Sequence, residues 1–214
     1  MHEIILFGIF ITFIISKILS KTILKGETSS FTLELPPYRR PQIIKVIIRS
    51  IFDRSLFVLK RAVIISAPAG FIIWMFANIY IGDASILKIC TNFLNPFGNI
   101  IGMDGVILMA FILGFPANEI VIPIMIMGYM SLGYITDISN ITELKTLFIN
   151  NGWTTLTAIC VMLFSILHFP CMTTILTIKK ETGSNKWAFL SFLIPLFVSI
   201  NICFIVNLIG EIIL

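Results

Sequence analysis

Long apolar runs separated by short polar stretches dominate the sequence, and their lengths match the thickness of a lipid bilayer. A helix needs about 20 apolar residues to cross the hydrocarbon. Four runs reach or approach that length: residues 4–24, 62–81, 153–178 and 187–209. A fifth, 105–133, is interrupted by Pro116, Asn118, Glu119 and Pro123. The pattern predicts an all-α integral membrane protein with about four transmembrane helices plus one broken or re-entrant helical segment.

The one long polar stretch, residues 25–61, contains a helical pattern of its own. The string ELPPYRRP is rigid and non-helical because proline fixes φ and lacks an N–H. After Pro41 the apolar positions form one helical stripe, which consists of Ile43, Ile44, Ile47, Ile48, Ile51 and Phe52. With Lys45 and Arg49 on other faces, this predicts one interfacial amphipathic helix. A helix packed on other parts of the protein is the alternative.

Composition and charge agree with a membrane protein and predict its orientation. Only 12% of the residues are charged and the mean hydropathy is +1.02, whereas soluble domains contain roughly 25% charged residues. Most of the lysines and arginines lie between the cores of the first two runs, which predicts that residues 25–61 are cytoplasmic and the N-terminus is outside. The first run lacks the basic start and cleavage site of a signal peptide, so we expect a retained helix. Residues 82–104 then form an outside loop.

The topology of residues 105–133 follows from the same charge rule. If this segment crossed the membrane once, Lys179, Lys180 and Lys186 would lie outside. If it enters and returns on the same side, all three lysines become cytoplasmic, as the rule prefers. The charge pattern therefore favours a re-entrant or broken segment.

Asn118 and Glu119 are the first candidate site. A charge at mid-membrane depth costs about 2.5–3.5 kcal/mol on insertion scales, so it usually faces a cavity or a partner. Pro116 and Pro123 remove backbone donors on either side of the pair. Broken helices of this kind recur where transporters bind ions at the membrane midplane. The alternative is a structural pair that caps a kinked helix, with Glu119 protonated.

The second candidate is the string LHFPCMTT, which contains His168 and Cys171. In a helix these residues, three apart, would lie on neighbouring faces. Imidazole and thiolate are good ligands for borderline first-row metals, and Cys160, eleven residues earlier, could share the stripe. Pro170 perturbs the helix, and a lone His with a lone Cys is more often packing. The methionines Met125, Met127 and Met130 are interpreted as core residues.

These strings resemble the C-terminal membrane region of the ferrous iron transport protein B (FeoB) family. The similarity runs from about Leu6 to the C-terminus and rests on ELPPYRRP, PANEI and HFPC followed by threonines. It implies a gate half that takes part in Fe(II) uptake. Asn118 and Glu119 match the PANEI string, and His168 and Cys171 match the H-x-P-C string, so these four are the expected metal-contacting residues. The resemblance divides the chain into an N-terminal transmembrane helix (1–24), a cytoplasmic linker (25–61) and a gate domain (62–214).

The chain departs from the family pattern because the GTP-binding domain and first gate half are absent. We expect either a split subunit, paired with a separate GTP-binding, first-gate FeoB-like subunit or assembled as a homo-oligomer, or a fragment of a longer reading frame. The location expected is the cell membrane (inner or plasma), crossed several times. Fe²⁺ would be the transported ion, with no permanently bound cofactor and no nucleic acid partner. The sequence contains no catalytic string, so no enzyme is expected. A nucleoside-transporter-like gate or a non-transporting scaffold is the alternative function.

Overall fold

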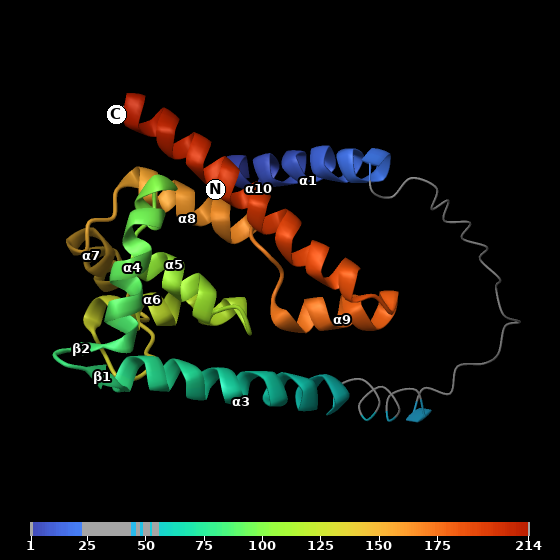
Figure 1. Ribbon diagram of the computed structural model, residues 1–214, viewed down its shortest axis with the longest axis horizontal. Coiled ribbons are helices and arrows are strands. Elements are labelled where there is room, and N and C mark those ends of the chain that lie inside the picture. Colours follow the sequence, from blue (N-terminus) through green and yellow to red (C-terminus); the bar gives the residue numbers. More distant parts are fainter. Residues whose placement is uncertain (1, 23–43, 46–47, 49–51, 53–55, 214) are drawn as a thin grey trace, which may run out of the picture. The chain divides into compact units, whose positions relative to one another are not determined.

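The computed structural model describes residues 2–22, 44–45, 48, 52 and 56–213, and most of these are helical (Figure 1). The chain divides into two compact units, Met1–Arg61 and Ala62–Leu214. In the first unit, α1 (His2–Thr22) is apolar and exposes most of its side chains, as expected for a helix surrounded by lipid. Most of the predicted interfacial helix, residues 43–52, lies outside the described residues.

Several described helices are long and apolar enough to cross a membrane. They are Glu3–Thr22, Asn185–Ile212 and the segment Thr155–Thr182, which is interrupted at residues 168–171. A fourth candidate is the pair α4 (Ile86–Ile100) and α5 (Gly105–Leu113), which is bent by 108° at the break between the two helices. The predicted span 62–81 corresponds to α3 (Phe57–Asn78), whose apolar part is shorter. The prediction of an all-α membrane protein with about four spans is confirmed.

One narrow stripe of α3 packs against the rest of the second unit. Ala69, Ile73 and Ala77 are buried and lie four residues apart along the helix. Large apolar side chains elsewhere on α3, such as Phe71 and Trp74, are exposed. An apolar helix with only one buried stripe is stable where the remaining surface faces lipid rather than water.

Residues 82–104 are not the simple loop that the sequence predicts. Strands β1 (Tyr80–Ile81) and β2 (Ala84–Ser85) pair antiparallel, and Ser85 then caps α4 by accepting a hydrogen bond from the Lys88 N–H. The hydropathy pattern does not predict helix α4, because its asparagines, its threonine and its lysine lower the mean hydropathy of the segment. One face of α4 is nevertheless buried, at Leu87, Thr91 and Gly98.

The corner between α4 and α5 depends on close backbone contact. The Gly105 N–H donates to the Asn95 side-chain oxygen at 3.0 Å, and the Asp104 carboxylate caps α5 by accepting from the Ile107 N–H at 2.7 Å. A Cβ at Gly105 would overlap the carbonyl oxygen of Thr91. Glycine is therefore required at this position for α5 to start directly against α4.

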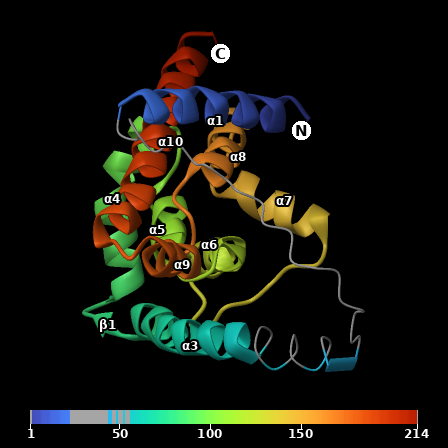
Figure 2. The same cartoon turned by 90° about the vertical axis from the view of Figure 1, so that its right-hand side faces the viewer.

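The remaining helices complete the second unit. After α5 come the 3₁₀ turn η2 (Asn118–Ile120), α6 (Val121–Met130) and α7 (Ile141–Asn150). The last three helices are α8 (Thr155–Leu167), α9 (Met172–Thr182) and α10 (Asn185–Ile213). Helix α10 packs along both α8 and α9 (Figures 1 and 2). The largest fully buried side chains of this unit are Ile73, Ile107, Ile124, Met125, Ile126, Met127, Cys160, Cys203 and Ser199. Met125 and Met127 are thus core residues as predicted, whereas Met130 is exposed.

Candidate functional site

Helices α5 and α6 form an antiparallel hairpin. At one end, a Cβ on Gly114 would overlap the side chain of Val121. At the other end, a Cβ on Gly128 would lie 2.7 Å from Cγ1 of Val106. The early part of α5 therefore faces the late part of α6, and the late part of α5 faces the start of α6. The chain therefore reverses direction within residues 105–130, as a re-entrant segment would.

The PANEI string forms the tip of this hairpin. Helix α5 ends at Leu113, the chain turns through Gly114 to Ala117, and η2 holds Asn118 and Glu119. Both of these side chains are exposed. Neither one caps η2 or α6 through a side-chain hydrogen bond. The structure therefore contains no capping role for the pair in this part of the chain, and the Glu119 carboxylate is available at the tip.

The HFPC string forms a second break, between α8 and α9. Helix α8 ends at Leu167, His168 has extended backbone, and Cys171 has extended backbone as the N-cap of α9. His168 and Cys171 therefore do not lie on neighbouring faces of one helix, because the helix is interrupted at Pro170, the residue expected to perturb it. Pro170 cannot donate to a helical hydrogen bond, and its ring disfavours helical backbone at the preceding residue. The two side chains instead belong to an irregular segment at a helix break.

Cys160 does not join the second break. Its side chain is fully buried, and the Cys203 thiol of α10 donates to the Cys160 carbonyl oxygen over 3.5 Å. The shared stripe considered from the spacing of Cys160 and Cys171 does not form, because α8 ends before Cys171. Cys160 and Cys203 instead fill the contact between α8 and α10, as small buried apolar residues do.

His168 lies in an aromatic environment with one ring nitrogen unused. Its Nδ1 is 2.9 Å from the Ser165 carbonyl oxygen, so this nitrogen carries the proton and donates. Its Nε2 then has a free lone pair, and this atom is buried without a partner among the described residues. The rings of Phe111, Phe164 and Phe169 surround the imidazole at centroid distances of 5.2, 5.7 and 5.1 Å.

The Cys171 thiol lies beside two hydroxyl groups at the start of α9. Its Sγ is 2.9 Å from Thr173 Oγ1 and 3.3 Å from Thr174 Oγ1. The side chain is partly exposed. In each contact either the thiol or the hydroxyl can donate. The Cys171 sulfur therefore lies, partly exposed, at the N-terminal end of α9.

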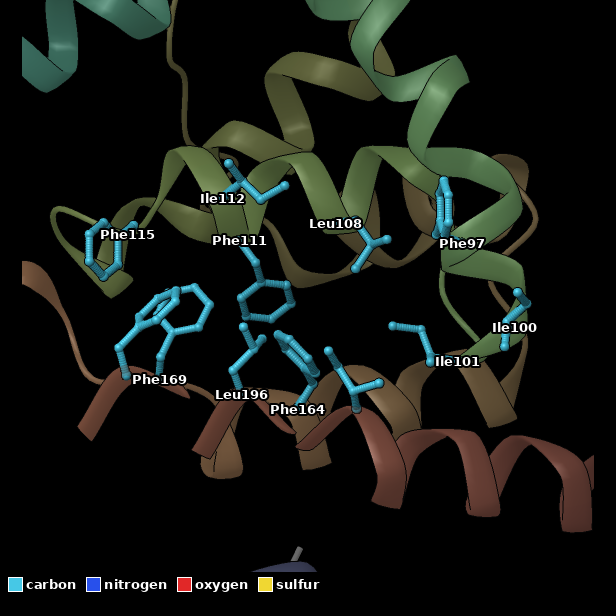
Figure 3. Close-up of a pocket in the computed structure, with 12 residues that line it drawn as sticks. Phe97, Ile100, Ile101, Leu108, Phe111, Ile112, Phe115, Phe164, Phe169 and Leu196 are labelled. Atoms are coloured by element: carbon cyan, nitrogen blue, oxygen red, sulfur yellow. The ribbon is translucent and has the colours of Figure 1, made fainter. Parts of the chain in front are cut away.

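The two breaks meet in space. The Met172 N–H, in the first turn of α9, donates to the Phe115 carbonyl oxygen at the end of α5 over 3.0 Å. Phe115 also packs edge-to-face on Phe169, with ring centroids 5.3 Å apart. Figure 3 shows these two rings on facing elements, at one end of an apolar cavity of about 520 Å³. The strings PANEI and HFPC, separated by about 50 residues, thus form one region.

This region is made of helix ends. The C-terminal ends of α5 and α8 and the N-terminal ends of α6 and α9 all border the two breaks. Such ends present unpaired carbonyls or N–H groups that can meet an ion. Among the described residues, however, no three His, Cys, Asp or Glu side chains come close enough to hold a metal ion. The region has donor groups of the expected kinds, but it does not by itself form a complete metal site.

A hydrogen-bonded chain closes the opposite, open end of the hairpin. The Tyr129 hydroxyl donates to the Asp104 carboxylate at 2.6 Å and accepts from the Trp153 indole N–H at 2.7 Å. The Trp153 ring stacks on Phe148 with centroids 4.2 Å apart. Sequence reasoning missed this connection. The only available signal was Asp104 immediately before an apolar run, which is the pattern of an N-cap.

Comparison with known proteins agrees with this architecture. Residues 3–54 match the family model described as "Ferrous iron transport protein B C terminus", and residues 59–185 match the Gate model, described as "Nucleoside recognition". The second match alone covers more than half of the chain. The chain belongs to the Gate family. No solved structure shows a significant match to the chain.

Relatives of this family occur in distant organisms. The chain is 31% identical to the Fe(2+) transporter FeoB of Staphylococcus aureus strain MSSA476, across 95% of the chain and 30% of the relative. It is 23% identical to the Fe(2+) transporter FeoB of Methanocaldococcus jannaschii, across 95% of the chain and 31% of the relative. In Porphyromonas gingivalis the match is to a fusion of Fe(2+) transport protein A with FeoB, 22% identical. The chain therefore spans less than a third of the length of these transporters.

Proposed function

We propose that this chain forms part of the permeation gate of a ferrous iron transporter, as a membrane subunit or as the C-terminal half of one. The observation that supports it is the meeting of the PANEI and HFPC breaks through the Met172–Phe115 hydrogen bond. Broken helices that converge in this way are the common construction of ion sites in transporters. The relatives named as Fe(2+) transporters make Fe(II) the substrate to test first.

The side chains at this region suit Fe(II) as cargo. Glu119 supplies a carboxylate and Asn118 an amide oxygen from the hairpin tip, Cys171 supplies a thiolate, and His168 supplies the free Nε2 lone pair. Imidazole and thiolate ligands favour iron over Mg²⁺ or Ca²⁺, which prefer oxygen ligands alone. Because Glu119 is exposed and the donors do not form a cluster within the described residues, we infer that another gate half completes the path. That half would belong to a GTP-binding, first-gate chain or to a second copy. No catalytic role is proposed.

The first experiment tests whether the chain needs a partner. We expect the purified chain alone, in liposomes, to take up no more Fe(II) than protein-free vesicles, because transporter sites form between repeats. Addition of the GTP-binding, first-gate chain should then produce uptake. Fe(II) entry is measured with an encapsulated iron-sensitive dye. Strong uptake by the monomeric chain without a partner would contradict the half-gate proposal.

The same vesicles distinguish the alternative function. The Gate model is described by nucleoside recognition, so a nucleoside permease is the specific competitor. Radiolabelled nucleosides should not accumulate in vesicles that take up Fe(II). Nucleoside accumulation without Fe(II) entry would show that the transported substrate is a nucleoside and not iron.

The second experiment tests orientation in the cell membrane. We propose that residues 25–61 are cytoplasmic, because a segment 105–133 that returned to its starting side would put Lys179, Lys180 and Lys186 on the same side as the basic linker, as the positive-inside rule prefers. In a cysteine-free background, Thr28→Cys should react with a membrane-impermeant maleimide only in inside-out vesicles. Reaction of Thr28→Cys with the maleimide in intact cells, and not in inside-out vesicles, would show that residues 25–61 lie outside.

A further inference from the structure

A second kind of cavity lies at the open end of the hairpin. Its volume is about 300 Å³, at the lower end of the range for ligand pockets. Unlike the apolar cavity in Figure 3, it is lined largely by polar side chains. The polar residues in its wall are Tyr80, Asp83, Ser85, Lys88, Thr91, Asn92 and Ser131. The chemistry of this wall is not explained by the fold or by the iron path.

The wall presents one negative and one positive charge. Asp83 lies in the turn between β1 and β2, and Lys88 lies in the first turn of α4. Neither side chain forms an ion pair or hydrogen bond with another residue in the part of the chain that the structure describes. Asn92, one helical turn after Lys88, adds an amide on the same side of α4. Both charges are exposed and available to a ligand.

The cavity lies where two apolar helices end. Helix α3 ends at Asn78 and α6 ends at Met130, and both are apolar. Beside the cavity, Tyr80 and Ile81 expose 63% and 64% of their surfaces. Exposed tyrosine next to exposed apolar residues is typical of the boundary between hydrocarbon and headgroups. The surroundings of the cavity are therefore those of a lipid headgroup.

We propose that this cavity binds the headgroup of phosphatidylethanolamine. Lys88 would contact the phosphate and Asp83 the ammonium group, so the two unpaired charges match the two charges of the headgroup. A primary ammonium has three N–H donors for the carboxylate and the neighbouring hydroxyl groups. A choline headgroup has none and is usually held by several aromatic rings, whereas this wall contains only one, Tyr80. The bound lipid would contact both legs of the hairpin, at Val106 and Gly128.

The test measures lipid binding and does not depend on iron transport. The purified full chain is mixed with equal amounts of phosphatidylethanolamine and phosphatidylcholine, and bound lipids are counted by native mass spectrometry. We expect about a tenfold preference for phosphatidylethanolamine, because its ammonium group donates a hydrogen bond to a charged carboxylate that choline cannot donate. Asp83→Asn should remove the preference, and Lys88→Gln should weaken binding of both lipids by about tenfold.

Matched variants elsewhere on the exposed surface provide the control. Asp137→Asn and Lys145→Gln remove the same charges outside the cavity and should leave lipid binding unchanged. Equal binding of the two lipids by the unaltered chain, or an unchanged preference in Asp83→Asn, would overturn the proposal. Soluble glycerophosphoethanolamine should compete poorly, because it lacks acyl chains. If glycerophosphoethanolamine competed fully at the same concentration as the lipid, the cavity would instead bind a soluble molecule that carries a phosphate and an amine.

Discussion

Glu119→Gln is expected to abolish Fe(II) uptake in the assembled transporter, while expression and membrane insertion stay near normal. Glutamine keeps the size and much of the hydrogen bonding of glutamate but removes the charge. The Glu119 side chain is exposed at the hairpin tip and caps neither η2 nor α6, so the fold should not require its charge. A carboxylate that meets a divalent cation does require it. Uptake is measured with radioactive iron in cells or vesicles containing the whole assembly.

Two comparisons separate an ion contact from a general charge effect. Glu181→Gln removes a carboxylate from the exposed end of α9 and should leave uptake unchanged. Glu119→Asp retains the charge and should restore part of the activity. Normal uptake by Glu119→Gln would show that this side chain is outside the iron path.

The same uptake experiment ranks Glu119, Cys171 and His168 by how much Fe(II) uptake is lost when each is substituted. Cys171→Ser should weaken uptake less than Glu119→Gln, because a hydroxyl is a poorer ligand but occupies the same space. His168 should matter least, since its imidazole already packs among Phe111, Phe164 and Phe169. A larger loss from Cys171→Ser than from Glu119→Gln would make the thiol the principal ligand.

Gly105→Ala is expected to destabilise the chain by about 3 kcal/mol or more, the upper range for overpacking in a tightly packed site. The added methyl would overlap the Thr91 carbonyl oxygen and come within 2.8 Å of the Asn95 backbone nitrogen. Both obstacles are backbone atoms of α4, which cannot rotate away as a side chain can. The α4–α5 corner would have to open, and the base of the hairpin would move with it.

The measurement is the thermal midpoint of the purified chain in detergent, followed by the folded fraction after extraction. Gly70→Ala is the matched control, because a Cβ at Gly70 in α3 meets nothing within 4 Å. Alanine should there be neutral or slightly stabilising, since glycine weakens a helix interior by roughly 0.5–1 kcal/mol. Equal thermal midpoints for the two variants would mean that the α4–α5 corner tolerates a wider separation.

The sequence predicted those features that depend on local composition. Apolar runs of bilayer length do not fold in water, so the membrane class and the positions of the long helices follow from hydropathy alone. Pro116 and Pro170 lack the N–H that an uninterrupted helix needs, so both breaks could be found without coordinates. The uneven distribution of lysines also indicated that residues 105–133 return rather than cross.

What depended on long-range contacts could not be found in this way. Helix α4 has a mixed composition, and its identity rests on packing against α5. The Asp104–Tyr129–Trp153 chain joins residues 24 and 25 positions apart, across two turns of the chain. The spacing of His168 and Cys171 did not show that one residue follows the end of α8 and the other caps the start of α9.

Three features follow from the sequence alone: the membrane environment of the chain, the places where its helices break, and the position of the Glu119 carboxylate between Pro116 and Pro123. Only the tertiary structure decided that the two breaks meet, because a hydrogen bond from Met172 to Phe115 has no periodic signature along the chain. It also decided that Cys160 pairs with α10 instead of Cys171. Hydropathy and proline act within a few residues, whereas the choice of neighbours depends on which side chains fit together across helices.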